Sequence, residues 1–161
     1  MPLRPLQQNK SPYYIFVLWG DHFEESALVI FTTTFREAGL HVKVVGLTGL
    51  RSTGKYGVGL YADLTLSQAL AVAPQTLCVI VPCSAATLKR IENDPRVSDF
   101  FQRASANHAQ FILPHGEVFE ASSLKKLALS RNDLLFYAEY PNLLSYAQEL
   151  AQALSVLTTR L

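Results

Sequence analysis

One cysteine, two histidines and several carboxylates stand in three short polar segments, each of which directly follows an apolar run. The segments are WGDHFEES at 19–26, PCSAAT at 82–87 and PHGEV at 114–118. A thiol paired with an imidazole base is the arrangement of a cysteine-dependent hydrolase. Cys83 is the candidate nucleophile, His115 the candidate base, and Glu24 or Glu25 the candidate carboxylate. The residues expected to line a ligand pocket are His22, Cys83, Ser84, His115, Gly116 and Glu117.

Each candidate also has a purely structural interpretation. Cys83 ends an apolar run, where a cysteine is usually a small packed hydrophobe, and His115 can simply cap the turn that it follows. Glu24 and Glu25 suit the first turn of a helix, because acids there offset the helix dipole. Ser84 suits the N-cap of the helix that follows it. The sequence leaves both interpretations open and favours the structural one.

A metal site is a third interpretation of the same residues. Cys83, His115 and His22 with one carboxylate would suit zinc in ligand type. However, the sequence contains no closely spaced Cys/His pair of the kind that zinc sites use. We therefore expect neither a metal nor another cofactor.

Strand-like and helix-like segments alternate along the chain. Apolar runs of strand length occupy 13–20, 41–49, 76–84, 109–114 and 133–140. Helical patterns lie at 23–40, at the end of 56–71 after a cap at Thr65 or Ser67, within 85–108 with a break at Pro95, and at 141–157. This alternation predicts an α/β fold with a doubly wound, mostly parallel sheet covered by helices on both faces. Ligands in such folds bind beyond the carboxyl ends of the strands, where the three polar segments lie.

Composition narrows the classes of function. The chain has 161 residues and a net charge of +1, from 14 basic and 13 acidic residues without a basic cluster, so we expect no nucleic-acid partner. No apolar stretch approaches the roughly 20 residues that span a bilayer, so we expect no membrane partner. We expect a flexible lead at 1–11, a single domain at 12–161 and a cytoplasmic location. Cys78 and Cys83 would lie too far apart on one strand for a disulfide, so both are expected to be free thiols.

The order of the segments resembles the ThiJ/PfpI family from about Tyr13 to Leu154. The resemblance rests on FEESALVIFTTTFREAGLHVKVVGLTG, GVGLYADLTLSQAL, CVIVPCS, ILPHGE and LLFYAEYPNLLSYAQELAQAL, taken in this order. It implies the flavodoxin-like, class I glutamine amidotransferase-like fold. Members of the family include chaperones, peptidase-like hydrolases, glyoxalase or deglycase-type enzymes and isonitrile hydratases.

The positions that carry the family's chemistry are replaced in this chain. Alignment of FEES with the family's Phe-Glu-Glu stretch places Ala27 where the family has a glutamate. Alignment of PHG with Cys-His-Gly places Pro114 where the family has its nucleophile, and the Pro-Gly-Gly turn becomes Pro82, Cys83 and Ser84. The resemblance therefore implies the fold and argues against the activity. We expect a catalytically degenerate binding, regulatory or assembly module; the alternative is a cysteine-dependent hydrolase or glyoxalase-type enzyme that uses Cys83 with His115.

The resemblance also implies a homodimer, and the first helix lies near the interface in many members. Phe100, Phe101 and Tyr137 read as exposed aromatic residues that association would bury. A protein or small-molecule partner is the other expectation. The glycines around Lys55 do not have the spacing of a phosphate loop, and they predict a turn before an extended segment.

Overall fold

A computed structural model describes residues 12–159 of the chain, and the predicted lead at 1–11 lies outside the described residues. Six strands form one sheet in the order β5-β2-β1-β6-β7-β8, and all its neighbouring strands are parallel. Strands β1 and β2 span Tyr14–Trp19 and Val42–Gly46, and β5 spans Leu64–Thr65. Strands β6, β7 and β8 span Thr76–Ile80, Gln110–Leu113 and Leu134–Phe136. The predicted doubly wound α/β fold is confirmed.

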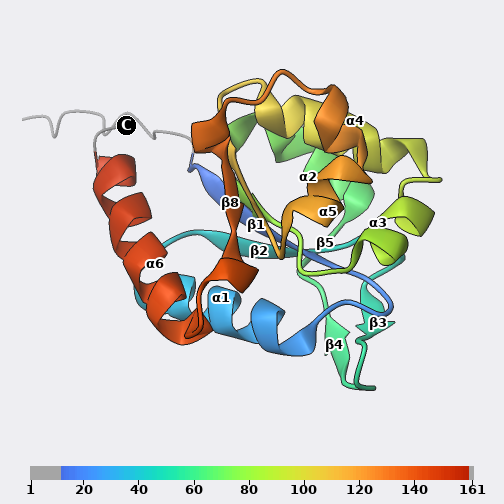
Figure 1. The fold of residues 1–161 in the computed structure, drawn as a ribbon, viewed down its shortest axis with the longest axis horizontal. Helices are drawn as coiled ribbons and strands as arrows, with labels where there is room; N and C mark the ends of the chain where they lie inside the picture. Colours follow the sequence, from blue (N-terminus) through green and yellow to red (C-terminus); the bar gives the residue numbers. More distant parts are fainter. Residues whose placement is uncertain (1–11, 160–161) are drawn as a thin grey trace, which may run out of the picture.

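Helices cover both faces of the sheet (Figure 1). On one face α1 (Glu25–Glu37) packs against α6 (Leu143–Thr159). On the other face lie α2 (Leu66–Val72), α3 (Ala85–Ile91), α4 (Pro95–Ser105) and α5 (Gly116–Glu120). Short 3-10 turns cover Ala73–Gln75, Ser123–Lys126, Arg131–Asp133 and Tyr137–Glu139. None of the helices in the described part is both long and apolar enough to cross a membrane.

The core explains why β1 and β6 are continuous apolar runs. Both strands lie inside the sheet with a helical layer on each face, so almost every side chain of either strand is buried. Phe16 of β1 contacts Phe100 of α4 edge to face, and Phe101 does the same with Phe111 of β7. Strand and helix therefore meet through aromatic pairs, whose edge-to-face geometry is favourable.

The residues that the sequence marks as helix starts agree with the starts of α2, α3 and α4 in the structure. Thr65 caps α2 in a complete capping box with Gln68, Ser84 caps α3, and Pro95 is the first residue of α4, as expected. The side chain of Asn142 accepts a hydrogen bond from Ser145 N, as an N-cap residue does.

The strands differ from the prediction in two ways. The third run ends at Ile80 rather than at Ser84, and of the last run only Leu134–Phe136 is a strand. The extended segment predicted after the turn at Lys55 contains β4 (Gly59–Tyr61), but the sequence missed β3 (Arg51–Thr53), with which β4 forms an antiparallel hairpin. It also did not resolve β5 as a separate strand, because two residues are too few to show alternation. This hairpin projects beyond the sheet, as Figure 1 shows.

The expectation that Phe100, Phe101 and Tyr137 are exposed is wrong. Phe100 and Phe101 are 0% exposed and Tyr137 is 6% exposed. Adjacent Phe100 and Phe101 are both buried because the apolar face of a helix is wide enough to include two successive residues. Tyr137 is buried because the turn after β8 directs its ring onto Phe31 of α1.

Candidate functional site

The junction after β7 lacks the geometry of a nucleophile elbow. Pro114 is buried at the end of the strand, and His115, the N-cap of α5, has extended backbone with φ −159° and ψ 173°. In residues 12–159 the non-glycine residues with positive φ are His22 and His108, and neither lies at this junction. A nucleophile elbow needs a strained turn that presents a reactive side chain, and this junction provides neither.

Cys83 lies on the turn after β6 and its side chain is fully buried. Burial raises the pKa of the Cys83 thiol well above its ordinary value, and the nearby carboxylates of Glu24 and Glu92 raise it further. The exposed side chain of His115 makes no hydrogen bond with Cys83. Since the nucleophile of a cysteine enzyme is the thiolate, this environment opposes activation of Cys83.

Glu24 is engaged with two neighbouring segments. Its amide donates to the carbonyl of Pro82 at 2.8 Å, which ties the start of α1 to the turn that holds Cys83. Its Oε2 accepts a hydrogen bond of 2.5 Å from the hydroxyl of Tyr137. Burial and the Glu24 carboxylate together raise the pKa of Tyr137, so this hydroxyl remains a proton donor. The sequence missed the contribution of Tyr137, because no local pattern links two residues so far apart in the chain.

Glu25 holds the β3–β4 hairpin. Its carboxylate accepts hydrogen bonds from the amides of Tyr56, at 2.9 and 3.1 Å, and Val58, at 3.1 Å. Burial opposes the charge, yet these amide donors lower the pKa of Glu25 below its usual value. Gly54 passes so close that an added Cβ would lie 2.3 Å from the carboxyl carbon of Glu25. The carboxylate therefore has a structural partner in the turn of the hairpin.

Ala27 packs on the inner face of α1 and is 2% exposed. With Glu24, Tyr56 and Leu143 it lines a small cavity of about 260 Å³. A methyl group therefore stands at the position where the resemblance implies a glutamate. Neither Cys83 nor His115 lines this cavity.

Some of the predicted pocket residues do meet. His22 and Ser84 line a cavity of about 270 Å³, together with the candidate carboxylate Glu24 and with Lys55, Thr87 and Arg90. Cys83 lies buried below the surface, and His115, Gly116 and Glu117 are exposed at the start of α5 and do not line this cavity. Across residues 12–159, no three His, Cys, Asp or Glu side chains lie close enough together to hold a metal ion.

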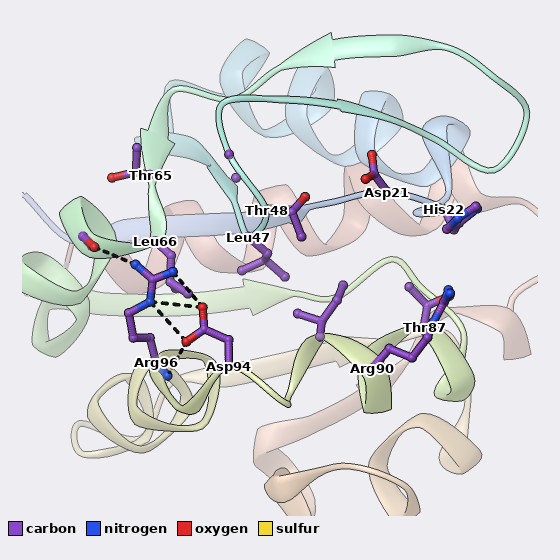
Figure 2. A pocket seen from close by; sticks show the side chains of 14 residues that line it. Asp21, His22, Leu47, Thr48, Thr65, Leu66, Thr87, Arg90, Asp94 and Arg96 are labelled. Carbon is purple, nitrogen blue, oxygen red and sulfur yellow. Dashed lines mark hydrogen bonds and ion pairs between the residues drawn. The ribbon is translucent and has the colours of Figure 1, made fainter.

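A larger cavity of about 770 Å³ lies beside β1, at the carboxyl edge of the sheet (Figure 2). Its walls come from the loops after β1 and β2 and from helices α2, α3 and α4. His22 is the one predicted pocket residue that lines it. The sequence missed the lining residues in the loop after β2 and in the last turn of α3, because these segments contain no cysteine, histidine or carboxylate to mark them. The free thiols and the candidate base thus lie outside the main cavity.

Comparisons with known proteins bear on the fold. No protein-family model matches the sequence, and no curated protein matches it significantly. Solved structures do match. Drosophila melanogaster DJ-1beta aligns with a TM-score of 0.67 and 16% identity over 89% of both chains. A cysteine-to-alanine mutant of a DJ-1 superfamily protein from Salmonella typhimurium aligns with a TM-score of 0.64 and 17% identity, over 91% of this chain and 90% of that one.

A third structure, oxidized DJ-1 from Toxoplasma gondii, aligns with a TM-score of 0.60 and 19% identity over 90% of both chains. At these identities the alignments establish the fold. They confirm the ThiJ/PfpI-type architecture that the order of the sequence segments predicted.

Proposed function

We propose, from the DJ-1/ThiJ/PfpI fold of this chain and the proline that ends β7, that the protein is a catalytically degenerate member that binds a ligand or partner without turnover. The observation that carries the proposal is Pro114. It occupies the position at which the resemblance implies the nucleophile, its side chain has no reactive group, and its ring holds φ near −65°. The strand therefore ends in a turn that cannot present a nucleophile.

Two further observations support the proposal. Ala27 removes the carboxylate that the resemblance implies beside the nucleophile. Cys83, the candidate nucleophile on the turn after β6, is fully buried and has Glu24 beside it. Its desolvation and the neighbouring negative charge both oppose formation of a thiolate.

The reactivity of Cys83 tests the proposal directly. We would follow iodoacetamide labelling of Cys83 against pH by mass spectrometry, in the native protein and in His115→Ala. The proposal expects slow labelling at every pH and no effect of the substitution. Fast labelling well below pH 8.5 or so that is lost in His115→Ala would instead support an enzyme with Cys83 as nucleophile and His115 as base.

Turnover assays complete this test. We expect no conversion of methylglyoxal, no hydrolysis of peptide or ester substrates and no hydration of isonitriles above the buffer rate. Any of these activities, if abolished by Cys83→Ser, would overturn the proposal and establish the displaced-thiol enzyme.

We also propose that two copies associate through the β3–β4 hairpin. Tyr56 and Tyr61 are 79% and 73% exposed, and Leu50 and Val58 are exposed beside them. Glu25 ties this hairpin to the start of α1, so the surface continues onto the helix that lies near the interface in many relatives. Large exposed apolar groups in one place are typical of association surfaces.

Light scattering coupled to size-exclusion chromatography tests the dimer. We expect the double variant Tyr56→Ser/Tyr61→Ser to be a monomer and Tyr13→Ser to remain a dimer, since Tyr13 lies beside the amino end of β1, away from the hairpin. A dimeric double variant would contradict this interface.

A cytoplasmic location is proposed as well, because Cys78 and Cys83 are unpaired, as thiols are in a reducing compartment. Cell fractionation would test this location.

A further inference from the structure

The cavity of about 770 Å³ has a size that suits a small organic ligand. It lies beside β1. The chain leaves β2 on one side of β1 and returns as β6 on the other side, so the strand order reverses at β1. Doubly wound sheets bind ligands at such a point of reversal. Leu47, Leu66 and Ile91 give it an apolar floor. Figure 2 shows Arg96 and Asp94 at one end and His22 and Arg90 at the other.

The two ends of the cavity differ in whether their charged side chains have hydrogen-bond or ion-pair partners in the protein. Arg96 donates to Asp94 from Nη2 at 2.7 Å and from Nε at 3.1 Å, and its Nη1 donates to Ser67 at 2.9 Å. Asp21 accepts the amide of Thr53 at 3.0 Å. Within residues 12–159 the guanidinium of Arg90 makes no hydrogen bond and no ion pair. Arg90 is exposed, and its donors are therefore available to a ligand.

The end of the cavity that contains Arg90 also holds other charged and polar side chains. Arg90, His22 and Thr87 line both the large cavity and the adjoining cavity of about 270 Å³. The smaller cavity adds Lys55, whose Nζ lies 5.5 Å from the ring centre of Tyr56, and the carboxylate of Glu24, which already accepts the hydroxyl of Tyr137. Two basic side chains, Arg90 and Lys55, face two carboxylates here, Glu24 and Asp21. Both carboxylates already accept hydrogen bonds, whereas the guanidinium of Arg90 has no partner within residues 12–159, so Arg90 is the group that would attract an anion.

Thr87 adds a hydroxyl at the same end of the cavity. It is 5% exposed, and its Oγ1 accepts a hydrogen bond of 3.0 Å from the hydroxyl of Ser84. In the described part of the chain its own hydroxyl proton has no acceptor. Because Thr87 lines both cavities, this hydroxyl can donate a hydrogen bond to a ligand that lies in them.

We propose that the cavity binds a small organic anion, whose carboxylate or phosphate group lies at Arg90, His22 and Thr87 and whose apolar part lies on Leu47, Leu66 and Ile91. This inference rests on the proposed function and names the class of ligand for it. The planar guanidinium of Arg90 matches both a carboxylate and a phosphate through two parallel hydrogen bonds. The apolar floor selects an anion with a hydrocarbon body over an inorganic ion.

Binding of defined probes to the full chain tests the inference. We would titrate the protein with hexanoate, phenyl phosphate, inorganic phosphate and the neutral analogue hexanamide, following amide chemical shifts by NMR. The expected result is saturable binding of hexanoate or phenyl phosphate at roughly millimolar concentration or below, with shifts at His22, Gly49 and Thr87. Hexanamide and inorganic phosphate should bind more weakly than these, and the stronger of the two organic anions identifies the acid group.

Matched charge variants complete the experiment. Arg90→Gln should weaken binding about tenfold or more, because it removes charge-assisted hydrogen bonds. Lys89→Gln removes the same charge from the neighbouring exposed residue of α3, which does not line the cavity, and should leave affinity unchanged. Equal losses in both variants, equal binding of hexanamide, or no binding of either organic anion would each overturn the inference.

The two proposals fail in different ways. Loss of the anion site leaves the labelling and turnover results for Cys83 unchanged, so the protein would remain degenerate but without this ligand. Turnover that depends on Cys83 would instead overturn the proposed function, whatever binds at Arg90.

Discussion

The hydroxyl of Tyr137 donates a hydrogen bond of 2.5 Å to Oε2 of Glu24, joining two residues that lie 113 positions apart. The bond connects the turn after β8 to the start of α1, beside the buried thiol of Cys83. The Glu24 carboxylate helps to raise the pKa of this thiol, after the larger effect of burial. The Glu24 carboxylate thus acts against formation of the Cys83 thiolate.

Removal of this hydroxyl should destabilise the protein. Tyr137→Phe leaves the half-buried carboxylate of Glu24 without its donor, and we expect a loss of about 1–2 kcal/mol in the free energy of unfolding. Urea denaturation measures it. Tyr140→Phe is the matched control, because the hydroxyl of Tyr140 has no hydrogen bond within residues 12–159 and its ring packs on Tyr146. Equal effects of the two substitutions would contradict the importance of the Tyr137–Glu24 bond.

Stability should decline in alkaline solution. Burial raises the pKa of the thiols of Cys78 and Cys83, so the native state keeps protons that the unfolded chain releases above about pH 8.5. Their contribution is fully present below that pH and is lost as the pH rises toward the folded-state pKa. Cys83→Ala should lose stability less steeply above about pH 9, by up to about 1.4 kcal/mol per pH unit.

Urea denaturation over a series of pH values gives this slope for the native protein and for Cys83→Ala. The comparison concerns the slope alone, so any change of packing in the variant does not affect it. Identical slopes would mean that Cys83 is accessible to water and that its thiol titrates normally in the folded protein.

The Glu25 carboxylate should order the hairpin. Glu25→Gln removes the charge that the amides of Tyr56 and Val58 bind, so hydrogen exchange of these amides should become faster. The pKa of Glu25 is lowered in the folded state, so its stabilising effect is present above about pH 4.3 and is lost as the pH falls through the folded-state value. Glu37→Gln, at the exposed end of the same helix, is the control and should leave exchange at the hairpin unchanged.

The backbone of His22 should favour glycine. His22 has φ 68°, a left-handed conformation in which a side chain costs energy, and its amide is held there by the carbonyl of Thr53 at 3.0 Å. We expect His22→Gly to be about 1 kcal/mol more stable than His22→Ala, since both lack the imidazole and only glycine avoids the strain. Thermal or urea unfolding of the pair measures the difference. Equal stability would show that the loop after β1 relaxes around the substitution.

Local patterns in the sequence determined the fold of this protein. The buried runs that became β1 and β6 are apolar throughout, because a parallel sheet covered on both faces leaves no polar side, and this property is readable without a structure. Thr65 and Ser84 mark helix starts because a cap acts within three residues of its own position. The replacement at Pro114 is likewise readable, since it depends on one position in an ordered series of segments.

The tertiary structure alone decided which side chains are buried and which distant residues they contact. Phe100 and Tyr137 read as exposed from their local sequence, yet Phe100 packs on β1 and Tyr137 on α1. Arg90 has no feature in the sequence to mark it, and it faces a cavity only because the chain crosses the sheet beside β1 and brings α3 opposite the loop that holds His22. The reason is physical: propensity and capping act between near neighbours, whereas desolvation, long-range hydrogen bonds and the shape of a cavity depend on which distant segments the fold brings together.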